Sequence, residues 1–357
     1  MAAPAAPFGV YLHVPFCASK CDYCAFATWT DRHHLADAYL GALRTDVERA
    51  VASGMPSATS VFVGGGTPSM VGGVELAEVI GLVPMADRAE VTVECNPDDV
   101  TDDLLEAYVA AGVDRVSVGV QSMATHVLGA LGRRHDRQNV IAAVDAIRRV
   151  GLASFNLDVI YGAAGESIDD WHHTVEAIVA LDPPHVSAYA LTIEPGTPLA
   201  SQPDRHPDDD DQADKYELVD DLLTDAGLVN YEISNWARPG HACRHNLLYW
   251  RQQNYRGFGC AAHSHHDGRR WWNVRTPERY IDQVVADEST EAAGETLDEG
   301  TRRFERLELQ LRMPEGVPLD ALDGDELPGL VDRNDDRWVL TRRGRLMAND
   351  IATRLNV

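Results

Sequence analysis

The sequence has few basic residues and few cysteines for its length, and it has no long apolar run. It contains 31 Lys and Arg against 56 Asp and Glu in 357 residues, a formal net charge of −25 at pH 7. Because phosphate contacts need a basic face, this balance argues against a general nucleic-acid-binding protein. No stretch of about 18 uninterrupted apolar residues is present, so no transmembrane segment is expected.

The N-terminus and the cysteine content argue against a secreted protein. The first ten residues, MAAPAAPFGV, have no basic flank and no long apolar region, so they do not resemble a secretory signal. The six cysteines, three of them within 17–24, do not form the dense pattern of a secreted disulfide framework. We therefore expect reduced thiols and a cytoplasmic protein.

Short β-rich runs alternate with helical patterns over the first 195 residues. Such alternation predicts βαβ units around a parallel sheet. Six units favour a partial (β/α)6 TIM-like barrel, an α/β fold, over a doubly wound sheet. The expected strands are 8–14, 60–65, 90–95, 114–120, 154–162 and 185–193. The expected helices between them are 35–54, 101–112, 138–151 and 167–181.

The remaining residues follow a different pattern. The Asp-rich stretch 203–214 is interpreted as a solvated turn and the acidic start of a helix, and 286–300 as a linker. The C-terminal residues predict a helix, a short strand, a basic turn and a last helix, similar to a winged-helix unit that caps the protein rather than binding DNA. The expected domains are a barrel at 1–235, a segment with the linker at 236–296, and a small winged-helix-like α+β domain at 297–357.

Three cysteines, Cys17, Cys21 and Cys24, follow directly on the first expected strand. A closed structural zinc site takes four ligands, usually as two separated pairs, so zinc is the weaker interpretation. Each iron of a four-iron cluster needs an outside ligand, and three thiolates leave one iron open. We therefore expect a [4Fe–4S] cluster whose open iron binds a substrate or cofactor.

This cysteine spacing carries a family resemblance. Cys17-x-x-x-Cys21-x-x-Cys24, with YLHVPF before it and VGGGTPS after it, resembles the signature of the radical S-adenosylmethionine (SAM) superfamily. The resemblance implies that SAM binds the open iron through its amino and carboxylate groups, and that a partial (β/α)6 barrel carries the site. Members similar to coproporphyrinogen dehydrogenases have SAM contacts that correspond here to Tyr11, Gly65, Thr67, Glu94, Gln121, Arg133 and Asp158.

Several of these residue types suit a ligand at the mouth of a barrel. Gly64, Gly65 and Gly66 end the second expected strand, where glycine lets the backbone approach a ligand closely. Glu94 ends the third strand, where a carboxylate can accept hydrogen bonds from ribose hydroxyls. Arg133 is suited to bind the methionine carboxylate. All lie near the carboxyl ends of expected strands, where barrel enzymes place their chemistry.

Later stretches extend the resemblance to the oxygen-independent coproporphyrinogen oxidase family. They are YALTIEPGTPLA, YEISNWARPGHACRHNLLYW and GFGCAAHSHHDGRRWWNV. The oxidases of this family have a further cysteine two positions after the third, and Phe26 stands there in this chain. The stretch HNLLYW at 245–250 matches the H-N-x-x-Y-W pattern of the family's heme chaperones. The chain departs from its relatives at Ala164 and Glu166, where they typically have proline and glutamine.

The H-N-x-x-Y-W stretch supplies the first candidate heme contacts. His245 offers a neutral imidazole, a common axial ligand of heme iron. Tyr249 and Trp250 are suited to stack on a porphyrin face. A histidine packed beside core aromatic residues is the alternative interpretation of His245.

Other residues compete for these roles. His263, His265 and His266 are rival heme ligands. A zinc site is a further alternative, because the spacing of Cys243, His245, Cys260 and His263 is similar to that of zinc ligands. Cys95 follows a strand and is expected to be a small buried residue.

The resemblance implies a protein that binds heme and delivers it to an acceptor, within porphyrin biosynthesis. The cluster and SAM would then be structural or regulatory, and no catalytic residue is assigned. The implied partners are heme and a heme-acceptor protein, for which a membrane-bound respiratory enzyme is one candidate. The alternative is an oxygen-independent coproporphyrinogen III oxidase, in which a 5′-deoxyadenosyl radical starts the decarboxylation of propionates. Phe26 and HNLLYW favour the first interpretation.

Overall fold

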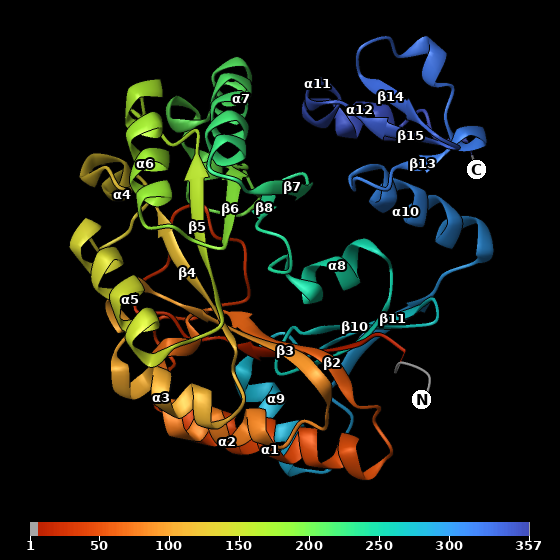
Figure 1. The fold of residues 1–357 in the computed structure, drawn as a ribbon. Coiled ribbons are helices and arrows are strands. Elements are labelled where there is room, and N and C mark those ends of the chain that lie inside the picture. Colours follow the sequence, from red (N-terminus) through yellow and green to blue (C-terminus); the bar gives the residue numbers. More distant parts are fainter. Residues whose placement is uncertain (1–5, 357) are drawn as a thin grey trace.

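The computed structural model of the protein describes residues 6–356, which form a curved sheet flanked by helices and a small C-terminal α+β unit (Figure 1). The main sheet has the strand order β12-β11-β10-β9-β1-β2-β3-β4-β5-β6-β8-β7. Its six central strands pair in parallel and in chain order, which confirms the partial (β/α)6 barrel. They are β1 (Phe8–Val14), β2 (Ala58–Gly65), β3 (Met85–Cys95), β4 (Arg115–Gln121), β5 (Ser154–Tyr161) and β6 (His185–Ala190).

The helices that connect these strands start and stop where local chemistry favours it. Thr101 caps α3 by accepting from the main-chain N of Leu104, and Asp136 caps α5 within a capping box. The Asp-rich stretch begins α7 as expected, since Asp208 is its N-cap. The helices are α1 (Ala36–Ala52), α2 (Gly73–Gly81), α3 (Asp102–Ala110), α4 (Thr125–Ala130), α5 (Arg137–Val150), α6 (Ile168–Ala180) and α7 (Asp209–Asp225).

Apolar β-branched residues build the core between the sheet and these helices. Val61 and Val63 on β2, and Val91 and Val93 on β3, are fully buried. Strands of a parallel sheet are rich in such residues because helices cover the sheet. Each side chain of this kind contributes about 1.5–3 kcal/mol by leaving water. The central strands therefore form a rigid support for the loops at their carboxyl ends.

Further strands extend the sheet on both sides of the barrel. β9 pairs in parallel with β1, and the other added strands pair antiparallel with their neighbours. The expectation that 286–300 is a linker is wrong for residues 291–296, which form β12 and pair with β11. Most β12 side chains are exposed, so the stretch lacks the apolar alternation that predicts a strand. The added elements are β7 (Val229–Glu232), β8 (Asn235–Ala237), α8 (Arg244–Trp250), β9 (Asn254–Phe258), β10 (His263–His266), β11 (Arg269–Asn273), α9 (Pro277–Val285) and β12 (Glu291–Thr296).

The C-terminal unit has a hydrophobic cluster of its own, which includes Leu311 and Ile351. The expected helix, strand and terminal helix are present, and Figure 1 shows them gathered in one part of the molecule. The expected basic turn is wrong for residues 342–346, which form the short helix α11, because the Thr341 side chain caps it by accepting from the main-chain N of Gly344. The elements are α10 (Glu299–Leu311), β13 (Val317–Pro318), β14 (Val331–Asn334), β15 (Arg337–Leu340), α11 (Arg342–Leu346) and α12 (Ala348–Ala352). None of the helices within 6–356 has the length and apolar character needed to cross a membrane.

The basic helix α11 of this unit packs against the barrel. Arg342 Nε lies 2.7 Å and Arg345 Nη2 lies 2.9 Å from Oδ2 of Asp220 on α7. Asp220 is buried, and its other carboxylate oxygen accepts from Trp236 Nε1 at 2.8 Å. Two arginines of α11 are thus held by a carboxylate of the barrel.

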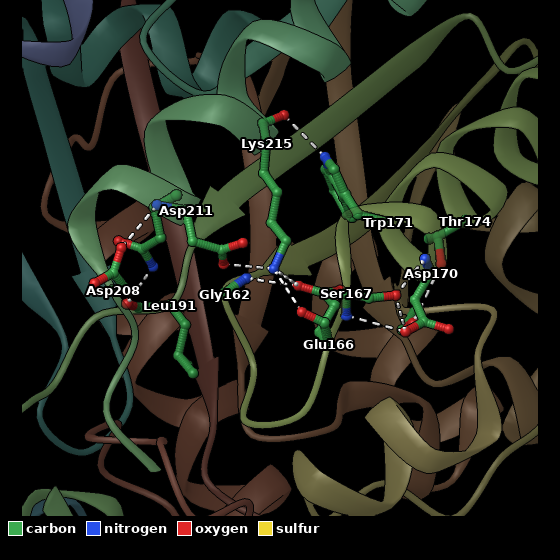
Figure 2. A network of polar contacts seen from close by, with 12 residues as sticks. Gly162, Glu166, Ser167, Asp170, Trp171, Thr174, Leu191, Asp208, Asp211 and Lys215 are labelled. Carbon is green, nitrogen blue, oxygen red and sulfur yellow. Dashed lines mark hydrogen bonds and ion pairs between the residues drawn. The ribbon is translucent and has the colours of Figure 1, made fainter. Parts of the chain in front are cut away.

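A buried ion pair fixes the loop after β5 to α7 (Figure 2). Lys215 Nζ lies 3.2 Å from Glu166 Oε2 and 2.6 Å from Asp211 Oδ2, and the Lys215 and Glu166 side chains are fully buried. The main-chain N of Gly162 also donates to Glu166, over 2.7 Å. Burial raises the pKa of Glu166, and the Lys215 charge opposes that rise. Because a lone buried charge is costly, Lys215 supplies the counter-charge that this acidic residue requires.

Candidate functional site

One cavity of about 720 Å³ lies at the carboxyl ends of the barrel strands. The cysteine loop and most of the predicted SAM contacts line it together, although they come from distant parts of the sequence. The predicted residues at this cavity are Cys17, Cys21, Cys24, Gly65, Gly66, Thr67, Glu94, Gln121, Arg133 and Asp158.

The cysteine loop follows β1 and is closed by main-chain bonds. The N–H of Cys17 donates to the carbonyl of Trp29 over 3.1 Å, and a turn joins Cys24 N to Cys21 O over 3.1 Å. All three cysteines are free thiols, and burial raises the pKa of Cys17 and of Cys24. Within residues 6–356, no three His, Cys, Asp or Glu side chains are grouped as ligands of a single ion. The loop suits a cluster better, because each cysteine then binds a different iron.

Two glycines keep the backbone after β2 close to the cysteine loop. Gly65 has φ +112°, and a Cβ there would lie 2.3 Å from Nδ1 of His13. A Cβ on Gly66 would lie 2.5 Å from the carbonyl oxygen of Phe16. Only glycine fits at these positions without displacing its neighbours. Both glycines line the cavity, where their main chain has no side chain in front of it.

Arg133 connects the cysteine loop with β4. Its Nη1 lies 3.7 Å from Cys21 Sγ, and its Nη2 donates to the carbonyl of Gly119 over 2.9 Å. Its Nε is buried and has no hydrogen-bond partner within the described residues. A Cβ on Gly119 would lie 2.6 Å from Nη2, so glycine there leaves room for the guanidinium. A buried guanidinium with an unused donor fits an anionic group such as the SAM carboxylate.

Two half-buried carboxyl groups, those of Glu94 and Asp158, also line the cavity. Glu94 Oε2 accepts from the main-chain N of Gly65 over 3.1 Å. Burial, and secondly the charge of Asp158, raises the pKa of Glu94 to about 7. Asp158 accepts from Ser117 Oγ over 2.6 Å and from Asn156 Nδ2 over 2.8 Å. A carboxyl group that is partly protonated near neutral pH suits ribose hydroxyls, which both donate and accept.

Sequence reasoning missed Ser117 and Asn156, which orient Asp158. In the sequence, each of them is a polar residue within a mostly apolar strand, and this pattern could have marked them as site residues. Ser117 and Asn156 are paired across β4 and β5. Gln121, at the end of β4, has φ 64° and follows an irregularity in the same pairing. A non-glycine residue in this conformation is strained, and such residues gather at ligand sites.

The H-N-x-x-Y-W stretch forms α8, which places His245 in the core. His245 is 1% exposed; its Nδ1 lies 2.9 Å from Ser60 Oγ and its Nε2 lies 2.8 Å from Tyr249 Oη. Its ring also stacks on Phe62, with ring centroids 5.5 Å apart. Burial lowers the pKa of His245 to about 3. Heme ligation by His245 stays a prediction, and it would require one of these contacts to break. Trp250 lines neither large cavity.

A second cavity of about 1050 Å³ adjoins the first. Phe26, Gly65 and Glu94 line both, whereas Tyr11 and Tyr249 line only the second. Phe26 is 63% exposed, although it is a large apolar residue. The position that carries a cysteine in the oxidases is thus a phenylalanine at the junction of two cavities.

The zinc alternative is not supported by the remaining cysteines. Cys243 Sγ contacts Glu90 Oε1 at 3.5 Å, and Cys260 Sγ contacts Tyr39 Oη at 3.6 Å. Among the described residues, no three His, Cys, Asp or Glu side chains are grouped as metal ligands, so the four proposed zinc ligands do not form a site. Cys95 is 4% exposed and belongs to the main hydrophobic core, which confirms that it is a small buried residue, and it lies at the wall of the first cavity.

Comparisons with known proteins agree with the fold and the cysteine loop. Residues 11–178 match the model of the radical SAM superfamily. A protein of Mycobacterium tuberculosis (strain H37Rv) named heme chaperone HemW is 42% identical, over 99% of this chain and 95% of its own length. The protein of the same name from Escherichia coli (strain K12) is 35% identical over 97% of each chain.

A solved structure extends the likeness to nearly the whole fold. The coproporphyrinogen III oxidase HemN from Escherichia coli, described as a radical SAM enzyme, matches with a TM-score of 0.84. The match covers 98% of this chain and 90% of HemN, at 22% sequence identity. That identity shows the fold alone, whereas the curated relatives show the family. The chain belongs to the HemW family of the radical SAM superfamily.

Proposed function

We propose that this protein is a heme chaperone, which binds heme and delivers it to an acceptor protein. The observation that carries the proposal is the 42% identity, along 99% of the chain, with a relative named heme chaperone HemW. Phe26 supports it, because the oxidase branch has a cysteine at that position. The acceptor is a separate protein, and a membrane-bound respiratory enzyme is a candidate. We place the protein in the cytoplasm, where its thiols stay reduced.

The chain's own residues are suited to hold a [4Fe–4S] cluster and SAM. Cys17, Cys21 and Cys24 would supply the three thiolates, as the free thiols of one loop. Arg133 would pair with the SAM carboxylate through its unused Nε, and Glu94 would meet the ribose. When bound, the pair supplies one-electron chemistry. In the proposed chaperone, these residues bind and orient the cofactors next to the second cavity.

The competing function is oxygen-independent oxidation of coproporphyrinogen III. One observation favours it: this chain combines the fold of HemN with three cluster cysteines and most of the predicted SAM-contact residues at one cavity. The two functions make different demands on the second cavity. A chaperone keeps heme intact until an acceptor takes it, whereas an oxidase releases a decarboxylated product.

Both functions can be tested on one anaerobically reconstituted sample. The first assay mixes heme-loaded protein with a heme-free acceptor protein and follows the transfer of the Soret absorption. The second supplies coproporphyrinogen III, SAM and a reductant, with HemN as the positive control. We expect heme transfer and no protoporphyrinogen. Formation of protoporphyrinogen over many turnovers would refute the chaperone proposal.

A further inference from the structure

We propose that the second cavity is the heme site and that His263 is the axial ligand of the heme iron. This inference rests on the proposed function, since it names the site at which a heme chaperone would hold its cargo. The cavity lies between the barrel mouth, strands β9–β12 and α10, and its walls include Phe26, Tyr249, His263 and Leu309. The proposal does not use the H-N-x-x-Y-W histidine.

Size and composition suit a tetrapyrrole. Cavities that hold drug-sized ligands measure roughly 300–1,000 Å³, and this one is about 1050 Å³. Phe26, Trp272 and Leu309 offer apolar or aromatic surface to a flat ring. Gln252 also lines the cavity, and its Nε2 is buried with no hydrogen-bond partner within residues 6–356. The cavity thus combines a large apolar wall with unused polar groups.

Among the histidines that line this cavity, His263 alone has both ring nitrogens without a hydrogen bond to any described residue. His13 uses Nδ1 on Tyr11 Oη at 3.0 Å and Nε2 on the carbonyl of Ala27 at 2.9 Å. His265 uses Nδ1 on the carbonyl of Gln253 at 3.0 Å, and its Nε2 accepts from the main chain. A coordinating imidazole needs a free nitrogen lone pair, which favours His263.

Two other candidate histidines lie elsewhere. His245 is buried in the core with both nitrogens in use. His266, at the end of the same strand as His263, lines a different and smaller cavity and pairs with Asp267 at 3.6 Å. Neither is placed to reach a ligand in the second cavity without rearrangement.

His263 is an exposed residue whose ring is supported by its cross-strand neighbour. His263 on β10 is paired across the sheet with Trp272 on β11, and their rings stack with centroids 5.6 Å apart and an angle of 27°. Partial burial, and secondly the charge of Arg270, lowers the pKa of His263. A lowered pKa favours the neutral imidazole, the form that coordinates iron.

Two arginines of the same cavity suit the heme propionates. Arg275 and Arg279 are exposed residues that line it, and neither guanidinium has a hydrogen bond or ion pair to another described residue, so both are accessible to a ligand. Arg270 also lines it, but its guanidinium is held by Glu295 and Glu305. Because the chain as a whole is strongly acidic, unpaired arginines beside an apolar cavity point to an anionic ligand.

Heme titration of the reconstituted full-length protein tests the ligand. We expect His263→Ala to raise the Kd for heme about tenfold or more, which is about 1.4 kcal/mol or more, and to change the Soret band. Excess free imidazole should restore the wild-type spectrum, a rescue that a merely structural role would not show. His266→Ala is the matched control, an exposed histidine on the same strand, and should behave like wild type.

The arginines are tested with a modified ligand. The double variant Arg275→Ala/Arg279→Ala should bind heme more weakly than wild type. Heme dimethyl ester, which lacks the propionate charges, should bind equally well to both proteins. An equal loss for heme and for the ester would overturn the role of the arginines.

The results also separate the inference from the proposed function. If wild-type protein binds no heme, the proposed function fails, and the inference fails with it. If wild type binds heme and His263→Ala binds it with the same affinity and spectrum, the inference alone is overturned. His245→Ala, measured beside it, then shows whether the H-N-x-x-Y-W histidine is the ligand.

Discussion

Nη1 of Arg133 lies 3.7 Å from Sγ of Cys21, although 112 residues separate them in the chain. This contact joins the two halves of the candidate cofactor site, the cysteine loop after β1 and the carboxyl end of β4. The same guanidinium has a buried Nε without a partner within the described residues. Arg133 is therefore placed to bind an anionic group beside the cluster cysteines.

Removal of this guanidinium should impair SAM binding without loss of the cluster. We expect Arg133→Met to keep the iron and sulfide content of wild type and to raise the Kd for SAM about tenfold or more, since a charge-assisted hydrogen bond contributes about 1.5–3 kcal/mol. Calorimetric titration of the reconstituted protein measures the affinity. Arg134→Met, at the neighbouring arginine that does not line the cavity, is the control. Equal SAM affinity in wild type and Arg133→Met would contradict the assignment.

The cluster assignment makes a separate prediction about the cysteines. Cys17→Ser, Cys21→Ser and Cys24→Ser should each abolish the brown chromophore, because no spare cysteine lies in the loop. Cys95→Ser should retain it, since Cys95 is buried in the hydrophobic core. Iron and sulfide analysis after anaerobic reconstitution measures the outcome. Wild-type iron content in Cys21→Ser would show that Cys21 is not a ligand.

The ion pair of Figure 2 predicts an asymmetric response to substitution. Lys215→Met should lower the free energy of unfolding by about 3–5 kcal/mol, because it leaves Glu166 as an unpaired buried charge. Glu166→Gln should cost less, since Lys215 keeps Asp211 at 2.6 Å. The double variant Glu166→Gln/Lys215→Met should recover part of the loss. Urea unfolding measures all three, and a double variant less stable than Lys215→Met would contradict this account.

Burial of His245 predicts a pH dependence of stability. Its pKa is about 3 in the folded protein, against an ordinary value of 6.5, so between these values the unfolded chain binds a proton that the folded chain does not. The free energy of unfolding therefore falls as pH drops from about 6.5, by up to about 1.4 kcal/mol per pH unit from this one group.

A variant isolates the contribution of His245. His245→Gln should be less stable at pH 7, because it loses the contacts to Ser60 and Tyr249, but its stability should fall less steeply with acid. Urea unfolding at pH 7 and pH 5 measures both effects. His34→Gln, at an exposed histidine, is the control and should keep the wild-type slope. An unchanged slope in His245→Gln would show that the imidazole is not buried neutral.

Prediction from the sequence succeeded for elements whose local residue pattern matches their packing in the fold. The residues of β1 are buried along its length, and it has the expected bounds of 8–14. The expected helix at 101–112 and the expected acidic start of a helix within 203–214 are both present as α3 and α7, because Thr101 and Asp208 satisfy N–H groups that helices leave free. The cysteine loop and the strand-end residues meet at one cavity, since parallel strands bring their carboxyl ends together.

Other features depend on contacts between distant residues and could not be predicted locally. β12 is an exposed strand held by its pairing with β11, and its own composition does not favour a strand. The H-N-x-x-Y-W pattern predicted His245 as a heme contact. A sequence pattern does not show which way a side chain points, and in the structure His245 points into the core. That His263 is free to bind a ligand, whereas His13 and His265 are not, becomes clear only from the hydrogen bonds of the folded protein.

Heme titration of the anaerobically reconstituted wild-type protein, followed by the Soret absorption, tests the central claim most directly. The account predicts saturable binding of one heme per chain, with no conversion of coproporphyrinogen III by the same sample. No saturable Soret change, or protoporphyrinogen formed over many turnovers, would contradict it.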